Sequence, residues 1–129
     1  MFDPLRFLDL AKNISKSGSV NPTEEATLRT AISRAYYAAH LHIRELLRRY
    51  YPSELTNTAL KKEKISEHRK VRILLIRRGL HHIADKHLAL FQFRVKADYR
   101  LHETVNKDDT AKSIQLAEDI IRQSNKYLK

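Results

Sequence analysis

NPTEEATLRTAISRAYYAAHLHIRELLRRYYP, residues 21–52, sets the architecture that we expect for the whole chain. It opens with Asn21 as a helix cap, Pro22 in the next position and Glu24 three residues after the cap, an arrangement typical of a capping box. Apolar and small residues then recur every three or four positions: Leu28, Ile32, Ala35, Tyr36, Ala39, Ile43, Leu46, Leu47 and Tyr50. This period predicts one long central helix with a buried face, which ends before Pro52.

Shorter helical patterns flank this segment. Before it, Asp3 and Pro4 start a helix that Gly18 ends; after it, residues 53–68 are polar and predict a loop with a short helix. A third helix is expected over residues 66–79 and ends at Gly79. A fourth should run from Ile83 or Asp85 into residues 94–99, burying Leu88, Leu90, Phe91 and Val95.

A fifth helix is expected from Asp108 or Asp109 to the end of the chain, with a buried face made by Ala111, Ile114, Ala117, Ile121 and Leu128. No segment alternates like a strand, and two glycines and three prolines leave few turns. We therefore expect an all-α fold, an antiparallel up-and-down bundle of four to five helices, with residues 1–129 as a single domain.

The composition narrows the class of partner. Lys and Arg number 25 against 15 Asp and Glu, and the formal charge of +10 attracts nucleic acid, an acidic protein or an anionic membrane surface. The chain has no cysteine, which excludes disulfides and thiolate chemistry. No apolar run is long enough to cross a bilayer and no secretory leader is visible, so we expect a cytoplasmic protein without a membrane partner.

Several kinds of chemistry are disfavoured by spacing. His40 and His42 lie about 200° apart on a helix, and no HExxH pattern accompanies the other histidines, so no metal site is expected. Ser33 has no glycine-flanked turn of the kind that exposes a nucleophilic serine. No glycine-rich phosphate loop is present, and we expect neither kinase nor dehydrogenase chemistry and no cofactor.

The sequence RVKADYRLH, residues 94–102, has the groups that cleave RNA without metal: a base, a cation and an acid. If the fourth helix continues through it, Arg94, Asp98 and His102 lie on one side and Tyr99 points about 140° from Arg94. The alternative is structural. Asp98 then pairs with Arg94, Tyr99 packs under the next loop and His102 is merely exposed.

Two motifs in this order, SRAYYAAHLHIRELL at 33–47 and FRVKADY at 93–99, resemble the HEPN superfamily, in particular its small stand-alone proteins. The resemblance covers essentially the whole chain. It implies a helical bundle, commonly a homodimer, often encoded beside a minimal nucleotidyltransferase as a toxin–antitoxin pair. Active members are metal-independent ribonucleases in which an arginine and a following histidine from two subunits form one composite cleft.

By this resemblance Arg94 is the arginine that stabilises the phosphate, and His102 or Tyr99 is its proton-transfer partner. Lys96, Asp98 and Arg100 are expected to help bind the substrate. The chain departs from the family pattern, in which four to six residues separate the arginine from the histidine: seven separate Arg94 from His102, and Tyr99 stands where four intervene.

Two hypotheses follow. The first is a HEPN ribonuclease toxin that cleaves RNA as a homodimer. The second, motivated by the shifted histidine, is a non-catalytic HEPN module that binds nucleic acid, a nucleotide or a partner nucleotidyltransferase. The first hypothesis is favoured if the structure brings Arg94, Tyr99 and His102 together at a basic cleft. The second is favoured if Arg94 is held by Asp98 and His102 points into solvent.

The two tyrosines of the central motif are expected to have structural roles, with Tyr36 in the core and Tyr37 at a helix or dimer contact.

Overall fold

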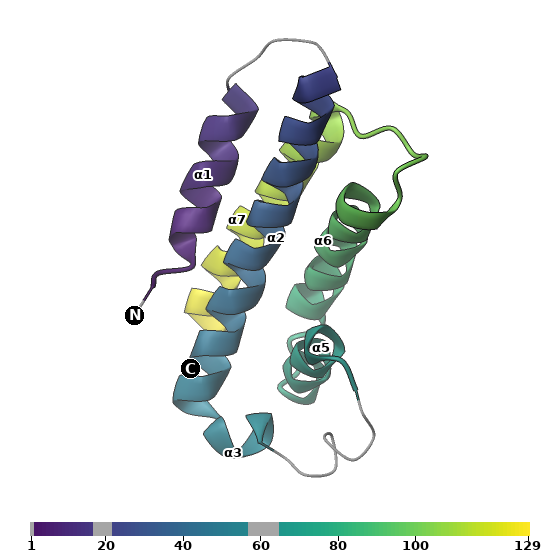
Figure 1. The fold of residues 1–129 in the computed structure, drawn as a ribbon. Coiled ribbons are helices and arrows are strands. Elements are labelled where there is room, and N and C mark those ends of the chain that lie inside the picture. The colour runs from purple at the N-terminus through teal and green to yellow at the C-terminus, as the bar shows by residue number, and fades with distance from the viewer. Residues whose placement is uncertain (1, 17–21, 57–64) are drawn as a thin grey trace.

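Helix α2 (Pro22–Tyr50) lies at the centre of the molecule, and every other described helix contacts it (Figure 1). The structure is a computed structural model that describes residues 2–16, 22–56 and 65–129. The other helices in these ranges are α1 (Leu5–Lys16), α3 (Pro52–Leu55), α5 (Glu67–Arg77), α6 (His81–Tyr99) and α7 (Lys107–Tyr127). All the secondary structure in the described part of the chain is helical, as predicted.

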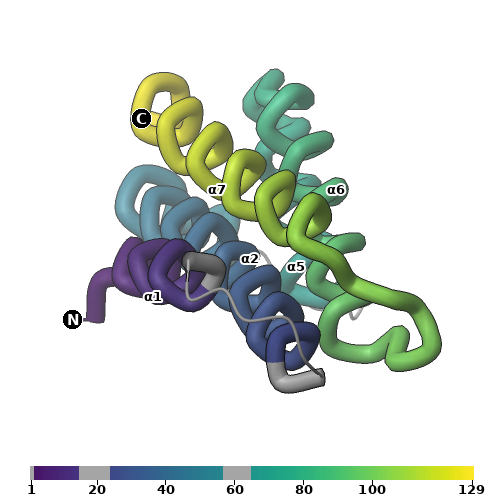
Figure 2. The backbone as a smooth tube through the Cα atoms, turned by 90° about the horizontal axis from the view of Figure 1, so that it is seen from above, coloured from purple at the N-terminus to yellow at the C-terminus, as the bar shows by residue number. Residues whose placement is uncertain are grey.

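The four long helices alternate in direction. Along the view of Figure 1, α1 and α6 run one way while α2 and α7 run the other. Figure 2, seen from above, shows α7 between α2 and α6, both of which it contacts, and α1 beside α2. The shorter α5 packs mainly on α6. The prediction of an antiparallel up-and-down helical bundle is therefore confirmed.

Local signals account for most of the helix ends. The carboxylate of Asp3 accepts a hydrogen bond of 3.0 Å from the Leu5 N–H, so the predicted start of α1 is confirmed. Gly79 ends α5 with φ 75°, a conformation that glycine adopts without strain. The last helix begins at Lys107, one residue before the earlier of its expected starts, and is capped by Asn106, which forms a capping box with Asp109. The predicted roles of Gly18 and Asn21 lie outside the described residues, as does the 57–64 part of the predicted loop.

The core is formed by one face of α2 together with residues of the surrounding helices. Tyr36 is fully buried at its centre, as predicted. The four alanines at positions 31, 35, 38 and 39 are also buried, which lets neighbouring helices approach α2 closely. The main apolar cluster draws its other large members from every long helix: Leu8, Ile43, Leu47, Leu74, Leu75, Ile83, Leu90, Ile120, Ile121 and Leu128.

Three residues predicted to be buried are exposed instead. Tyr50, at the last position of α2, is 44% exposed because the chain turns away there into α3. Leu88 is 40% exposed because His87 and Leu90 take the inward positions of α6. Ala111 is exposed because its neighbour Thr110 faces α2, where its hydroxyl donates to the Leu28 carbonyl.

Helix α6 begins at His81, two residues before the earlier of its expected starts, and it ends at Tyr99. Arg100 has φ −93° and ψ 73°, which are not helical. The chain then forms a short connection to α7. No helix in the described ranges is long and apolar enough to cross a membrane.

Candidate functional site

The guanidinium of Arg94 on α6 is enclosed by side chains of α2 and α6. Its Nη2 donates hydrogen bonds to the hydroxyl oxygens of Tyr37, at 3.0 Å, and Tyr99, at 3.2 Å. Its Nε lies 2.8 Å from Oδ2 of Asp98, one turn further along the helix, which confirms the predicted local ion pair. The Arg94 side chain is only 12% exposed, so these contacts hold the cation in one orientation.

The two motifs noted in the sequence meet at this point. Ser33 of α2 donates a hydrogen bond of 3.2 Å to Oδ2 of Asp98, and Tyr37 lies one turn further along α2 and contacts Arg94. The Cζ atom of Arg94 is 5.4 Å from the centre of the Tyr37 ring. Tyr37 is therefore a helix contact, one of its two predicted roles, and α2 fixes the position of the Arg94 cation.

Tyr99 gives the site an exposed aromatic surface. Its side chain is the last on α6 and is 65% exposed, so it does not pack under the following loop as the structural alternative predicted. The centre of its ring lies 5.0 Å from Cζ of Arg94. The exposed ring of Tyr99 thus lies next to the largely enclosed cation of Arg94.

The other three predicted site residues lie elsewhere. Lys96 forms an ion pair of 3.2 Å with Asp109 at the start of α7, and Arg100 forms one of 3.7 Å with Glu103. His102 is exposed in the connection after α6. The structure thus brings Arg94, Asp98 and Tyr99 together and leaves Lys96, Arg100 and His102 apart from them. The arrangement considered for a helix that continues through His102 does not form, because α6 ends at Tyr99.

A cluster of three histidines surrounds the buried Tyr36 next to this site. The Tyr36 hydroxyl is 2.5 Å from Nδ1 of His68 and 3.4 Å from Nε2 of His87. The same His87 nitrogen is 3.0 Å from Nδ1 of His40. On the other side of its ring, Nδ1 of His87 is 3.3 Å from the guanidinium of Arg72. One hydrogen-bonded chain therefore joins α2, α5 and α6.

Burial keeps these histidines neutral. It lowers the pKa of His40 to about 3, with a further contribution from His68, and it lowers the pKa of His87 well below its ordinary value. Burial also lowers the pKa of His68, and the positive charge of Arg94 is the next largest cause. At neutral pH all three imidazoles are uncharged and have one N–H and one lone pair each.

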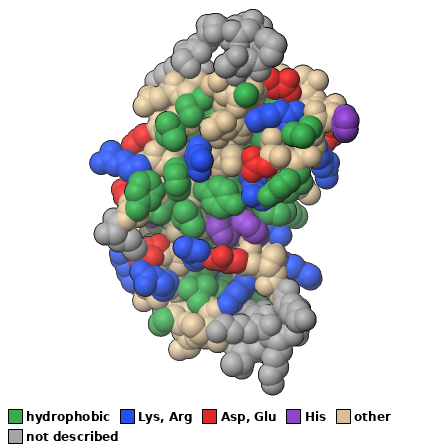
Figure 3. Space-filling model, viewed as in Figure 1, with side chains coloured by type: hydrophobic (Ala, Val, Ile, Leu, Met, Phe, Trp, Pro, Cys, Tyr) green, Lys and Arg blue, Asp and Glu red, His purple; other side chains and the backbone are tan. Residues whose placement is uncertain are grey.

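Tyr37 connects this histidine cluster to Arg94. Its ring packs edge-on against Tyr36, with 5.3 Å between ring centres, and lies 6.4 Å from the ring of His68. Arg94 contacts the same Tyr37 ring. Figure 3 shows histidine side chains at the middle of the face that α2 and α6 share, among hydrophobic and basic side chains. His68 and Arg94 are thus part of one surface region, which we call the Arg94–His68 site.

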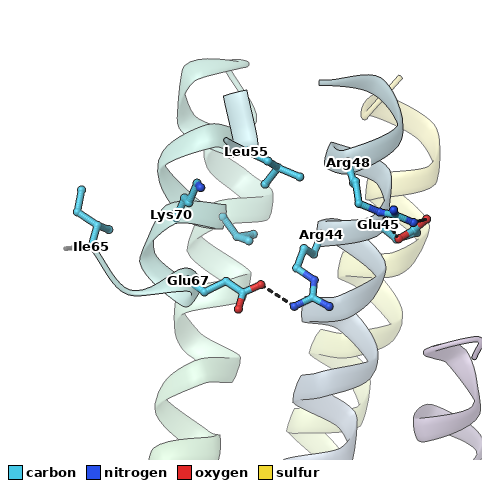
Figure 4. Close-up of a pocket in the computed structure, with 8 residues that line it drawn as sticks. Arg44, Glu45, Arg48, Leu55, Ile65, Glu67 and Lys70 are labelled. Carbon is cyan, nitrogen blue, oxygen red and sulfur yellow. Dashed lines mark hydrogen bonds and ion pairs between the residues drawn. The ribbon is translucent and has the colours of Figure 1, made fainter. Parts of the chain in front are cut away.

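A pocket adjoins this site at the start of α5 (Figure 4). It is lined by Arg44, Glu45, Arg48, Leu55, Ile65, Glu67, Lys70 and Val71. Its charges are largely neutralised, because Arg44 pairs with Glu67 at 2.6 Å and Arg48 pairs with Glu45 at 2.8 Å. The pocket therefore offers a less basic surface than its arginines indicate.

His68 is the site residue that the sequence reasoning missed. It lies in the first turn of α5, where Ser66 caps the helix by accepting a hydrogen bond of 3.3 Å from the Arg69 N–H. The signal in the sequence was its spacing: His68 and Arg72 are four residues apart and so share one helix face. Both reach the Tyr36 cluster from that face.

No protein-family model, curated protein or solved structure matches this chain. Among the described residues, no group of three or more histidine and acidic side chains is arranged to hold a metal ion. In the histidine cluster, Nδ1 of His40 and Nε2 of His87 contact each other at 3.0 Å and do not point toward a common centre.

Proposed function

We propose that this protein is a HEPN-like module that binds single-stranded RNA at the Arg94–His68 site. The observation that carries the proposal is the pairing of a fixed cation, Arg94, with an exposed aromatic ring, Tyr99, at 5.0 Å. Proteins that bind single strands combine these two groups, since the cation attracts the phosphate and the ring stacks on a base. The net charge of +10 supplies the long-range attraction.

Binding without cleavage is favoured by the position of the histidine that the family resemblance selects. His102 follows the end of α6 and is exposed, while Arg94 is locked to Asp98. These are the features that favour the non-catalytic hypothesis. The homodimer that the family resemblance implies and the nucleotidyltransferase partner of that hypothesis remain part of the proposal.

A direct test measures the binding of a fluorescent single-stranded RNA of about 12 nucleotides to wild type and variants at two salt concentrations. Tyr99→Ala should weaken binding about fivefold or more, because a base loses its stacking partner. Arg94→Ala should weaken it about tenfold or more and reduce the dependence on salt. Tyr127→Ala and Arg6→Ala remove an exposed ring and an exposed charge from other faces.

These control variants should bind RNA as wild type does. Circular dichroism of each variant separates a loss of binding from a loss of folding. The proposal is contradicted if Tyr99→Ala and Arg94→Ala are folded and still bind RNA with the affinity of wild type.

Metal-independent RNA cleavage by a homodimer, the toxin activity, is the second candidate function. The observation that favours it is the contact of 3.2 Å between Arg94 and the Tyr99 hydroxyl, since the family resemblance assigns the phosphate to Arg94 and offers Tyr99 as a proton-transfer partner. Incubation of long RNA with the protein in EDTA tests it, with Arg94→Ala as the comparison. Cleavage by wild type that Arg94→Ala abolishes would favour this candidate over binding alone, and equal cleavage by both proteins would exclude the site.

A further inference from the structure

The hydrogen bonds of the histidine cluster run in one direction, and Arg72 sets that direction. A guanidinium is only a donor, so Nδ1 of His87, at 3.3 Å, must accept from Arg72. His87 is fully buried and neutral, so its single proton is on Nε2. That N–H donates to Nδ1 of His40 at 3.0 Å, which leaves the His40 proton on its own Nε2.

The proton of Tyr36 then has one acceptor. Its hydroxyl lies between Nε2 of His87, which already bears a proton, and Nδ1 of His68. Burial raises the pKa of Tyr36, so the phenol stays protonated at neutral pH. The Tyr36 hydroxyl therefore donates to Nδ1 of His68, and the lone pair of that nitrogen is occupied.

His68 is consequently held as one tautomer. With Nδ1 accepting from Tyr36, the proton of the neutral ring is on Nε2. Nε2 lies across the imidazole from Nδ1, on the side away from the buried hydroxyl. This N–H donates no hydrogen bond within residues 2–16, 22–56 and 65–129, and the side chain is partly exposed beside Tyr37.

We propose that His68 contacts the RNA as a hydrogen-bond donor, with its Nε2–H directed to a phosphodiester oxygen that also attracts the Arg94 cation. This inference rests on the proposed RNA binding and names a second ligand-contacting residue for it. It also defines what His68 does not do. A ring with its proton on Nε2 has no outward lone pair, so it does not remove the proton of a 2′-hydroxyl.

The tautomer is tested in the free protein by correlating the ring nitrogens and carbon-bound protons of His68 in an NMR spectrum of ¹⁵N-labelled protein at neutral pH. We expect a protonated Nε2 and an unprotonated Nδ1. Tyr36→Phe, which removes the only donor to Nδ1 in the described structure, should allow the other tautomer to appear. A wild-type His68 protonated on Nδ1 would overturn the inference whether or not RNA binds.

The contact is tested with the same fluorescent RNA. His68→Ala should weaken binding about fivefold, while His68→Gln, whose amide N–H replaces Nε2–H, should recover most of the affinity. Wild-type affinity in a folded His68→Ala protein would overturn the role of His68 and leave the proposed RNA binding intact. Absence of RNA binding by wild type would overturn both, and the NMR result identifies which step of the argument failed.

Discussion

Arg29 in α2 donates a hydrogen bond of 2.9 Å to the carbonyl oxygen of Lys96 in the last turn of α6. The same guanidinium donates to the carbonyls of Ala97, at 3.0 Å, and Glu103, and it pairs with Glu25 at 3.0 Å. The last carbonyls of a helix have few partners within the helix, and Arg29 supplies donors to two of them and to the connection that follows, although the Lys96 carbonyl also accepts from the Arg100 N–H at 3.2 Å. One side chain of α2 thus stabilises the end of α6 that presents Tyr99.

Replacing Arg29 should therefore destabilise the protein. Arg29→Ala removes the hydrogen bonds to the carbonyls of Lys96, Ala97 and Glu103 and leaves Glu25 without its cation, so we expect the free energy of unfolding to fall by about 2–4 kcal/mol. Arg29→Lys should retain part of the lost stability, because an ammonium still donates hydrogen bonds. It should not retain all of it, because an ammonium lacks the planar fork of donors that reaches several carbonyls. Urea titrations followed by circular dichroism measure both, with the exposed Arg6→Ala as control. Equal stability of Arg29→Ala and Arg6→Ala would show that the cap contributes nothing.

The two leucines of α6 should differ sharply when each is truncated. Leu90 is fully buried in the main cluster and Leu88 is 40% exposed. Leu90→Ala leaves a cavity and should lower the free energy of unfolding by about 2–5 kcal/mol, whereas Leu88→Ala should change it by less than about 1 kcal/mol. Thermal and urea unfolding of the two variants provide the comparison. Similar losses in both would mean that α6 is rotated from the orientation described.

The buried alanines of α2 should not tolerate larger side chains. Ala39→Leu places a bulky group where a neighbouring helix packs closely, and we expect a loss of about 1–3 kcal/mol. Ala26→Leu, at an exposed position of the same helix, is the matched control and should stay within about 0.5 kcal/mol of wild type. A melting temperature for Ala39→Leu as high as that of Ala26→Leu would contradict close packing at this position.

Mild acid should destabilise the fold before the carboxylates titrate. The pKa of His40 is lowered from 6.5 to about 3, and the pKa values of His68 and His87 are lowered too. As the pH falls below 6.5, the unfolded chain binds protons that the folded chain does not, so stability is lost. Each histidine adds a slope of up to about 1.4 kcal/mol per pH unit.

Urea titrations between about pH 7 and pH 5 measure this slope, since the ordinary pKa of Asp and Glu is lower than this range. His40→Phe keeps a ring of similar shape and removes one titrating group, so it should reduce the slope. A free energy of unfolding that is level over this range would mean that the cluster is solvated and titrates normally.

Periodicity and caps were sufficient to predict the helices because both are local. The spacing of Leu28, Ile32 and Tyr36 alone defined the buried face of α2. The end of α6 had no comparable signal, since it depends on a hydrogen bond from Arg29, which is 67 residues away in sequence from Lys96. His102 was chosen as the first histidine after Arg94, by resemblance to the family pattern, and the sequence did not show that α6 ends before it, at Tyr99.

The imidazole of the site was missed for a similar reason. His68 adjoins a polar segment without clear periodicity, and its partner Tyr36 lies 32 residues before it in the chain. Arg94 and Asp98 were found together because they are four residues apart on one helix, where a local rule applies. The sequence therefore predicted the pair on α6 and not the group that α5 adds to it.

The position of α7 at the end of the chain affects how the protein folds while it is being translated. This helix covers both α2 and α6, and its buried residues complete the main apolar cluster. A nascent chain that ends before Lys107 leaves that surface exposed to water, and translating residues 107–127 takes roughly one to four seconds. During this interval the unfinished bundle is a natural substrate for chaperones, and slow codons within α7 should reduce the soluble yield.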